Sequence, residues 1–306
     1  MDYNGKKILV TGASGFIGHL LCRHLSEQDA EIHATSRQIH ARSEVNIKWW
    51  RADLADEDTV ESLFATVKPD IVFNLASEVT GGRELAKITP TFRGNLMSAV
   101  NVLIAATRHE CQRVVMAGSL EEPDRDDPSP VPCSPYAAAK WAANGYARMF
   151  HALYATPVVV ARLFMVYGPG QQDLLKLVPY VTLSLLRGEP PKLSSGLRPV
   201  DWVYVSDVVG GLLKLGNATG VDGVTVDLGS GELVTTREVV ETLRDIIGGS
   251  VHPEFGALPD RPMERVKTAD VDTAYRMIGW KPAVSLREGL NKTAEWYRSQ
   301  LKTGNL

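Results

Sequence analysis

The chain has few cysteines, little net charge and no long apolar run. Its 306 residues include 3 cysteines, an odd number without metal-binding or redox spacing, and this favours a reducing cytoplasm. A net charge of −3 gives no reason to expect nucleic-acid or membrane binding. No apolar stretch approaches the roughly 20 residues of a membrane helix. None of the 7 histidines forms a His-x-x-x-His pair, so no metal site is expected.

A glycine-rich turn stands near the start of the chain. Gly12, Gly15 and Gly18 recur at three-residue intervals. An apolar run at 7–10 precedes them, and an amphipathic helix near 16–25 follows. Such glycines permit a tight turn, close approach of a pyrophosphate to backbone N–H groups, and close packing of helix on strand. The spacing differs from the Gly-x-Gly-x-x-Gly of dinucleotide-binding dehydrogenases, and a turn that serves packing alone is the alternative.

Strand and helix patterns alternate through the first half of the chain. Strands are expected at 7–10, 31–35, 47–51, 71–74, 113–117 and 158–163, and helices near 16–25, 57–67, 91–109 and 135–154. This alternation predicts an α/β fold, a Rossmann-like doubly wound parallel sheet with helices on both faces. We expect a dinucleotide-binding domain over 1–165, rejoined by 203–229, and a smaller discontinuous C-terminal lobe over most of 166–306.

The helix expected at 135–154 carries a candidate proton-transfer pair. Ser134 suits its N-cap and Pro135 its first turn. Four-residue spacing places Tyr136 and Lys140 on one face. Because a nearby ammonium favours phenolate, we expect the pKa of Tyr136 to be lowered, as a proton donor to a carbonyl or acceptor from an alcohol requires. Most isolated Tyr-x-x-x-Lys pairs are ordinary surface residues, so the glycine turn upstream is needed to support this interpretation.

Together these motifs resemble those of the extended short-chain dehydrogenases/reductases, in the branch of nucleotide-sugar epimerases, dehydratases and ketoreductases. The likeness covers nearly the whole chain and is carried by 11–18, 74–77, Ser119, Tyr136, Lys140, 162–169, 201–207 and 279–282. It implies an NAD(P)-dependent enzyme whose substrate is a nucleotide-diphosphate sugar, held by the C-terminal lobe. It also implies that Ser119 polarises the reacting oxygen beside Tyr136 while a hydride moves to or from the nicotinamide.

The resemblance also implies a set of cofactor contacts. They are Gly12, Ser14, Gly15, Phe16, Ile17, Gly18, Ser36, Arg37, Asp53, Leu54, Leu75, Ala76, Tyr136 and Lys140. Asp53 matches the aspartate that contacts adenine, with the N-cap of the helix beginning near residue 56 as the alternative. Ser36 and Arg37 stand where NAD-users of the family carry aspartate. Arginine suits a 2′-phosphate, so NADP(H) is favoured and NAD(H) is possible; a solvated surface arginine is the alternative.

The residues after Ser119 bear on the type of reaction. The resemblance implies that sugar dehydratases carry aspartate where this chain has Leu120, so dehydration is not expected. Glu121 retains the glutamate of those enzymes and is a candidate base. The stretch 118–122 is also similar to that of reductases acting on GDP-4-keto-6-deoxy sugars. A solvated acidic pair, Glu121 and Glu122, is the alternative interpretation.

Substrate contacts and assembly are implied by the same resemblance. The substrate-binding set is Ser119, Tyr136, Arg198 and Arg261, with the two arginines on the diphosphate. Relatives commonly pack the helices 91–109 and 135–154 against a second subunit. The second helix is rich in large apolar residues, namely Trp141, Tyr146, Met149, Phe150 and Leu153. A homodimer is therefore expected, and burial of these residues within the monomer is the alternative.

Three functions compete at this stage. The first is NADPH-dependent reduction of a keto-sugar nucleotide, of the 4-keto-6-deoxy kind, supported by Arg37 and the stretch 118–122. The second is a nucleotide-sugar epimerase that keeps NAD(P) tightly bound. The third is a non-catalytic, cofactor-binding regulatory protein. The intact set of Ser119, Tyr136 and Lys140 argues against the third.

Overall fold

The six apolar runs of the first half form strands of one sheet, which a later strand joins. The structure, a computed structural model, describes residues 3–38, 46–123, 129–263 and 265–306. The strand order is β10-β6-β5-β4-β1-β2-β3, and the pairs from β6 to β3 are parallel. The strands are β1 (Lys7–Thr11), β2 (Glu31–Ser36), β3 (Ile47–Arg51), β4 (Ile71–Asn74), β5 (Arg113–Ser119), β6 (Val158–Leu163) and β10 (Thr225–Leu228). The predicted Rossmann-like sheet is confirmed.

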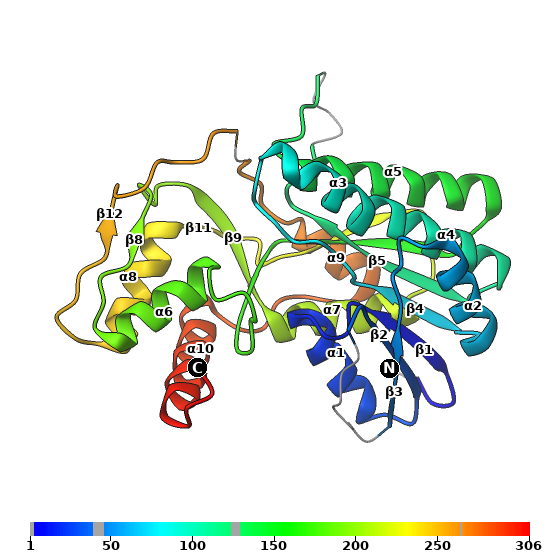
Figure 1. Ribbon diagram of the computed structural model, residues 1–306, viewed down its shortest axis with the longest axis horizontal. Coiled ribbons are helices and arrows are strands. Elements are labelled where there is room, and N and C mark those ends of the chain that lie inside the picture. Colours follow the sequence, from blue (N-terminus) through cyan, green and yellow to red (C-terminus); the bar gives the residue numbers. More distant parts are fainter. Residues whose placement is uncertain (1–2, 39–45, 124–128, 264) are drawn as a thin grey trace. The chain divides into compact units, whose positions relative to one another are not determined.

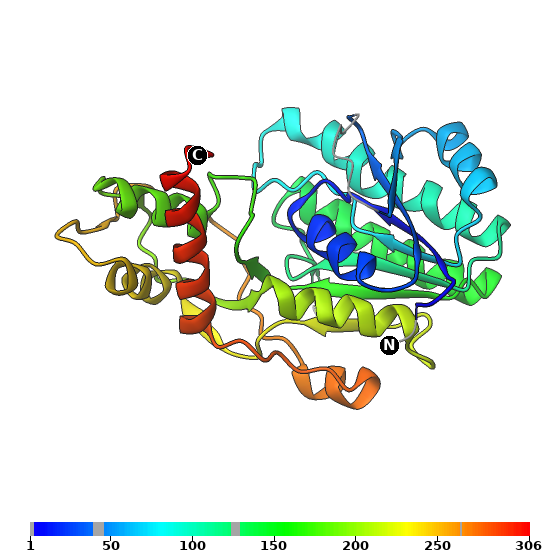
Figure 2. The same cartoon turned by 90° about the horizontal axis from the view of Figure 1, so that it is seen from below.

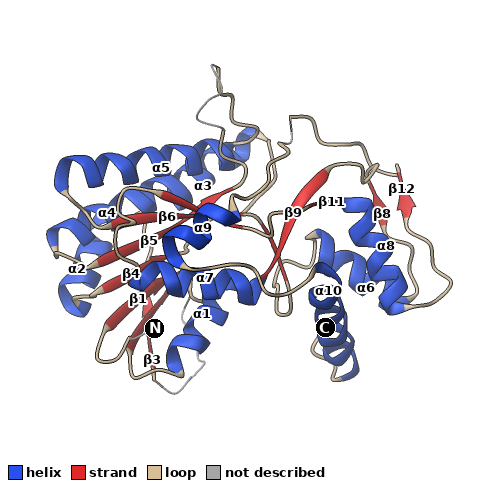
Figure 3. Cartoon of the chain, turned by 180° about the vertical axis from the view of Figure 1, so that it is seen from behind, coloured by secondary structure: helices blue, strands red, loops and turns tan. Residues whose placement is uncertain are grey.

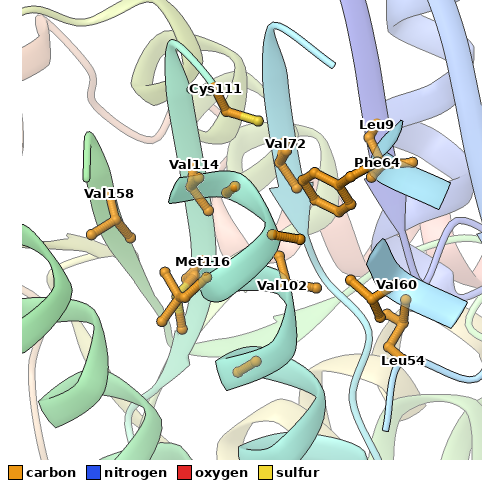
Figure 4. Packing of buried hydrophobic residues seen from close by; sticks show 14 of the residues in the cluster. Leu9, Leu54, Val60, Phe64, Val72, Val102, Cys111, Val114, Met116 and Val158 are labelled. Carbon is orange, nitrogen blue, oxygen red and sulfur yellow. The ribbon is translucent and has the colours of Figure 1, made fainter. Parts of the chain in front are cut away.

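Helices cover both faces of this sheet. On one face lie α2 (Glu57–Val67), α4 (Ser98–Arg108) and α5 (Pro135–Tyr154) (Figure 1). On the other lie α1 (Phe16–Ser26) and α7 (Val205–Asn217), which stand in front of the strands in Figure 2. Aliphatic residues of the strands interdigitate with those of α2 and α4 in a closely packed core (Figure 4). Burial of this apolar surface stabilises the strand ends that carry the candidate site.

One predicted helix is built differently from expectation. In place of one α-helix over 91–109, the chain forms a short 3₁₀ turn η1 (Leu85–Lys87), α3 (Ile88–Thr91), a π-helical segment η2 (Phe92–Met97) and then α4. Asn95 lies inside η2, and its Oδ1 accepts hydrogen bonds from Ser77 Oγ at 2.9 Å and Glu78 N at 2.7 Å. A π-helical segment often marks a functional site. Here it aims a buried side chain at the loop after β4.

The chain divides into two compact units. The first comprises Met1–Leu163, Val209–Asp227 and Asp272–Trp280, and the second comprises Phe164–Val208, Leu228–Val271 and Lys281–Leu306. The returning segment therefore begins at Val209, later than the predicted residue 203. The reason is that β9 (Pro199–Tyr204) belongs to a sheet of the second unit. The helix α9 (Val271–Ile278), which lies almost wholly in the first unit, was not predicted.

The second unit has its own small sheets and core. Its strands are ordered β11-β9-β7 in one sheet and β12-β8 in another: β7 (Met165–Tyr167), β8 (Lys192–Leu193), β9, β11 (Leu233–Thr235) and β12 (Glu254–Phe255). Its helices are α6 (Leu177–Arg187), α8 (Thr236–Ile247) and α10 (Leu286–Lys302), which pack on one another (Figure 3). Thr235 and Glu238 form a reciprocal capping box at the start of α8. Within the described ranges, no helix is long and apolar enough to cross a membrane.

Candidate active site

The glycine turn packs directly against the loop after β4. Gly12 has a φ of +64°, and a Cβ on it would lie 2.7 Å from Ala76 N. A Cβ on Gly18 would overlap the carbonyl oxygen of Gly12, so only glycine lets α1 approach the turn so closely. Gly15 is the N-cap of α1 and provides no side-chain cap. This turn therefore has a form that suits a pyrophosphate against the N-terminus of α1. Ser14 lies in the turn, and Phe16 and Ile17 begin the helix.

A buried hydrogen bond fixes the two central strands beneath this turn. Thr11 Oγ1 donates to Asn74 Oδ1 at 2.7 Å, and Ala76 N donates to Thr11 Oγ1 at 3.1 Å. Thr11 and Asn74 are register partners at the ends of β1 and β4. Leu75 and Ala76, both predicted cofactor contacts, are half-buried and are held at the same edge. This is the switch point at which ligands of such sheets bind.

The structure brings Ser119, Tyr136 and Lys140 together. Ser119 ends β5, and Ser134 caps the helix whose first turn carries Tyr136. The phenol of Tyr136 is hydrogen-bonded to Ser119 and lies beside Ser77. Lys140 Nζ lies 5.9 Å from the centre of the Tyr136 ring and donates to Ala117 O at 2.9 Å. A hydroxyl, a phenol and an ammonium therefore converge within one site, as the sequence predicts.

The electrostatics of this set differ from the prediction. Desolvation raises the pKa of Tyr136 to about 12, an effect that its hydrogen bond to Ser119 opposes and the charges of Glu121 and Glu122 reinforce. Desolvation likewise lowers the pKa of Lys140 to about 8, against the opposing charge of Glu122. The expectation that Lys140 lowers the pKa of Tyr136 is therefore wrong for the chain by itself. Burial outweighs the helical pairing, because Lys140 bonds to a backbone carbonyl instead of the phenol.

Glu121 contacts the start of α5. Its Oε2 accepts from Ser134 Oγ at 3.4 Å and lies 3.8 Å from Cys133 Sγ. Glu121 N donates to Ser119 Oγ at 3.2 Å. A carboxylate is favoured at the N-terminus of a helix, where the macrodipole is positive. The local structure thus gives Glu121 a clear part in holding the start of α5, and its use as a base stays a prediction.

Glu122 has an environment that the sequence did not suggest. Its residue surface is only 3% exposed, so the interpretation of Glu121 and Glu122 as a solvated acidic pair is wrong. Burial raises the pKa of the Glu122 carboxyl, while hydrogen bonds from Ser119 and Asn144 oppose that rise. A buried carboxyl group that is hydrogen-bonded at a strand end is a structural feature of this site.

The end of β2 is polar and open. Arg37 is 75% exposed at its side chain, and its Nη2 lies 3.5 Å from Glu78 Oε2. Ser14 Oγ donates to Ser36 Oγ at 3.3 Å, which ties the glycine turn to the end of β2. The guanidinium of Arg37 is accessible to a ligand, but a carboxylate stands beside it. The structure thus places Ser36 next to the glycine turn and Arg37 beside Glu78.

Asp53 and Leu54 lie at the end of β3 in contrasting environments. Asp53 is exposed, accepts from Ala55 N at 3.0 Å, and lies 3.5 Å from Arg93 Nη2. The N-cap of α2 is Asp56, so the alternative that Asp53 caps this helix is wrong. Leu54 is 5% exposed and belongs to the core, which leaves only its backbone for a ligand contact.

Both predicted substrate arginines lie in the second unit. Arg198 donates from Nε and Nη2 to the carbonyl of Arg265, at 3.2 and 2.8 Å. Arg261 is exposed in the same loop, four residues earlier. Asp201 is 1% exposed and accepts from Ala269 N at 3.0 Å, so it anchors the end of that loop to β9. Arg198 thus positions the segment that presents Arg261.

Several polar residues of the site were not predicted. Ser77 is hydrogen-bonded to Tyr136 and donates to Asn95, and Glu122, which accepts from Asn144, acts on Tyr136 through its charge. Asn144 follows Lys140 by four residues, so the same spacing places it on the helix face that carries Tyr136 and Lys140. No sequence pattern predicts the π-helical geometry around Asn95 or the burial of Glu122.

The remaining titratable clusters give no metal site. Among the described residues, no group of three or more His, Cys, Asp or Glu is placed to hold a metal ion. The three cysteines, Cys22, Cys111 and Cys133, are buried and not disulfide-bonded.

Comparison with known proteins identifies the family of this arrangement. Residues 8–229 match the model of the NAD dependent epimerase/dehydratase family. The chain is 29% identical to UDP-glucose 4-epimerase of Mycolicibacterium smegmatis, over 96% of this chain and 99% of that protein. It is 30% identical to dTDP-glucose 4,6-dehydratase of Streptomyces niveus, over 95% of this chain and 93% of that protein.

A solved structure gives the same result for the fold. UDP-glucose 4-epimerase of Thermotoga maritima, solved with UDP-glucose, superposes with a TM-score of 0.88 at 26% identity and covers 96% of this chain and 99% of that one. The predicted enzyme family is confirmed, and the interpretation as a non-catalytic regulatory protein loses its support. With its glycine turn, its serine, tyrosine and lysine, and its doubly wound sheet, the chain belongs to the NAD dependent epimerase/dehydratase family.

Proposed function

We propose that the protein is a nucleotide-sugar epimerase that oxidises and re-reduces the same sugar carbon with one retained cofactor. The observation that carries this proposal is the set of Ser119, Tyr136 and Lys140 beside Leu120. Leu120 is 5% exposed and apolar, and it stands where the resemblance places the dehydratase aspartate. The site thus has groups for moving one proton at one oxygen, without that extra acid for expelling water. The relatives named above include an epimerase over the full chain length.

The residues present fit a dinucleotide. The turn at Gly12 and Gly18 leaves no room for side chains, and the N-terminus of α1 has no side-chain cap. A bound NAD(P) would supply the hydride acceptor, and then the hydride donor, at the sugar carbon. Gly12, Gly15 and Ser14 would hold its pyrophosphate, and Lys140 would lie at its nicotinamide end.

The protein groups perform the proton transfers. Tyr136 takes the proton of the sugar hydroxyl as the C–H hydride leaves, and it returns that proton to the keto oxygen when the hydride comes back to the opposite face. Ser119 hydrogen-bonds the same oxygen in both directions. Lys140 supplies positive charge beside the phenol, which favours the phenolate when the cofactor's own positive charge is also near. In the second unit, Arg261 would bind the diphosphate, on a loop that Arg198 positions.

NAD(H) suits this proposal better than the NADP(H) preference predicted from Arg37. Glu78 lies 3.5 Å from the Arg37 guanidinium and partly neutralises it. A 2′-phosphate would have to compete with that carboxylate. Calorimetry of NADH and NADPH binding tests this point: comparable or tighter NADH binding is expected. Glu78→Gln should improve NADPH binding selectively, and Arg37→Ala should reverse that gain.

NADPH-dependent reduction of a keto sugar is the second candidate. Its specific observation is the absence of an acidic side chain at the end of β2, where Ser36 and Arg37 stand instead. Tight NADPH binding, together with steady oxidation of added NADPH on a 4-keto-6-deoxy sugar nucleotide, would favour this candidate over the epimerase.

The deciding experiment examines the purified protein and its products. Denaturation followed by mass spectrometry should release NAD(H) in near-stoichiometric amount. Incubation with UDP-glucose, UDP-galactose and dTDP-glucose, followed by NMR of the sugar, should show inversion at one carbon without net consumption of added cofactor. Protein that contains no cofactor, and that turns over only when NADPH is added, would contradict the epimerase proposal.

A further inference from the structure

The carboxylate of Glu122 is buried between the end of β5 and the helix α5. Its Oε1 accepts from Ser119 N at 2.7 Å, and its Oε2 accepts from Asn144 Nδ2 at 2.7 Å. A buried carboxyl group is costly unless both oxygens find donors, and here each has one. The group therefore joins the backbone at the catalytic serine to the helix that carries the catalytic tyrosine.

A glycine makes this arrangement possible. A Cβ on Gly118 would lie 2.8 Å from Glu122 Oε1 and 2.8 Å from Val160 Cγ1. Any larger residue at 118 would push the carboxylate away from the strand end. The spacing of Gly118, Ser119 and Glu122 thus lets the loop fold back, so that the glutamate caps the peptide N–H of the serine.

The partner of Glu122 on the helix α5 is Asn144. Asn144 follows Tyr136 and Lys140 at successive four-residue intervals, so the three side chains lie along one face of α5. Asn144 is 7% exposed, and it also exchanges a hydrogen bond with Thr225 Oγ1 on β10. The Glu122 carboxylate is therefore anchored to a rigid point in the first unit.

We propose that Glu122 is a positioning residue of the catalytic centre, which holds Ser119 against the α5 face that carries Tyr136 and Lys140. This inference rests on the proposed catalytic role of these three residues. It assigns to Glu122 a part distinct from that of Glu121, whose carboxylate lies at the start of α5. The buried charge also acts on the ammonium of Lys140.

The charged groups around this centre define the expected pH effect. Glu122 raises the pKa of Lys140, against desolvation that lowers it to about 8. The charged and titratable groups that bear on Glu122 and on the phenol of Tyr136 are Arg162 on β6, Lys140 and Tyr136 on α5, and Glu121 on the same loop as Glu122. Arg162 is itself paired with Asp227 at 2.8 Å. Neutralising Glu122 should therefore lower the pKa of Lys140 further.

Glu122→Gln tests the proposal with little change in shape. The amide keeps one oxygen for Ser119 N, and Asn144 can turn its own amide over, because Thr225 Oγ1 is able to donate or accept. With UDP-glucose as the probe, kcat should fall about fivefold to tenfold, because neutral hydrogen bonds replace the charge-assisted ones that the carboxylate accepts, with KM within about twofold. The alkaline limb of the kcat profile should move to lower pH. Unchanged kcat and pH profile would overturn the proposal.

A second readout does not need the substrate. Lys140 titrates near 10.5 when unfolded and near 8 when folded. The unfolded chain therefore binds more protons between these values, and the free energy of unfolding rises with pH across that window. In Glu122→Gln the rise should begin at lower pH, because the folded pKa is lower. Urea unfolding from pH 6 to 11 measures this. An unmoved window would contradict the proposed link between Glu122 and Lys140.

Two further variants separate the possible outcomes. Asp207→Asn removes another buried carboxylate, which accepts from Val284 N in the second unit, and should leave both pH profiles unchanged. If Glu122→Gln does not fold, Gly118→Ala keeps Glu122 but displaces its carboxylate, and it should lower kcat alike; normal kcat there would overturn the inference. If Tyr136→Phe loses activity while Glu122→Gln and Gly118→Ala keep it, the inference is wrong and the proposed function stands. Full activity in Tyr136→Phe would defeat the proposed function itself.

Discussion

The helix α5 buries polar residues on one side and exposes apolar residues on another, which is the reverse of an ordinary surface helix. On one side Lys140 and Asn144 are 6% and 7% exposed, although both are polar. On another side Tyr146 and Leu153 are 42% and 66% exposed, although both are largely apolar. An ordinary amphipathic helix buries its apolar stripe and exposes its polar one. The buried polar side carries residues of the candidate active site. The exposed apolar side is the surface that the predicted dimer would use.

Exposed apolar residues also occur on elements that pack against α5 or next to them. α5 packs against α3 and η2, and this region exposes Leu85, Ile88 and Phe92 by 85%, 48% and 45%. An isologous two-fold dimer would cover exposed apolar residues of this kind. Of the residues singled out from the sequence, Phe150 is buried and Trp141 and Met149 are half-buried, which leaves Tyr146 and Leu153 for a partner. The homodimer stays a prediction.

The largest expected effect is on the buried side. Tyr136→Phe keeps the ring but removes the proton, so turnover should fall by about 10²–10⁴-fold, the usual contribution of a general acid–base group. Binding of NADH, measured by calorimetry, should change little. Near-normal turnover would remove Tyr136 from the mechanism and would leave its burial beside Ser119 without a catalytic reason.

A smaller effect is expected on the exposed side. Leu153→Asp places a charge in the proposed dimer patch and should weaken self-association at least tenfold, because a buried leucine contributes about 1.5–3 kcal/mol. Sedimentation velocity across a concentration series measures this. Leu175→Asp is the matched control, since Leu175 is 87% exposed but lies in the second unit. A wild-type mass near 33.5 kDa at micromolar concentration would contradict the dimer.

The smallest effect is expected between the two sides. Gly145 lies in α5 after Asn144, and a Cβ added there would meet nothing within 4 Å. Gly145→Ala should therefore stabilise the protein by up to about 0.5–1 kcal/mol, because alanine loses less conformational entropy in a helix. Thermal unfolding should show the gain, with kcat unchanged. A loss of stability would mean that this position packs against a partner.

The sequence predicted the first unit well for physical reasons that can be named. Its strands are continuous apolar runs closed by glycine or polar residues, and α5 has a serine cap and a first-turn proline. The second unit was harder, because β7, β8, β11 and β12 span only two or three residues and follow no alternation. Their pairing depends on contacts between distant segments, such as β11 with β9.

In the candidate site too, the features that depend on contacts between distant segments were not predicted from the sequence. Spacing was enough to bring Tyr136 and Lys140 onto one face, but their pKa values depend on burial, which a pattern does not report. Glu122 resembled a surface residue because its partners lie elsewhere: Asn144 is 22 residues away in the sequence. Desolvation and long-range hydrogen bonds therefore account for most of what sequence reasoning missed.

In the proposed epimerase reaction, one hydride leaves and returns to the same sugar carbon while Tyr136 moves the proton. The most direct test uses the nucleotide sugar identified in the product assay, labelled with deuterium at the carbon that inverts. We expect the epimerised product to keep the deuterium at that carbon, even with excess unlabelled cofactor in solution, and Tyr136→Phe to form almost no product. Loss of deuterium from the product, or its appearance in the free cofactor pool, would contradict the proposed reaction.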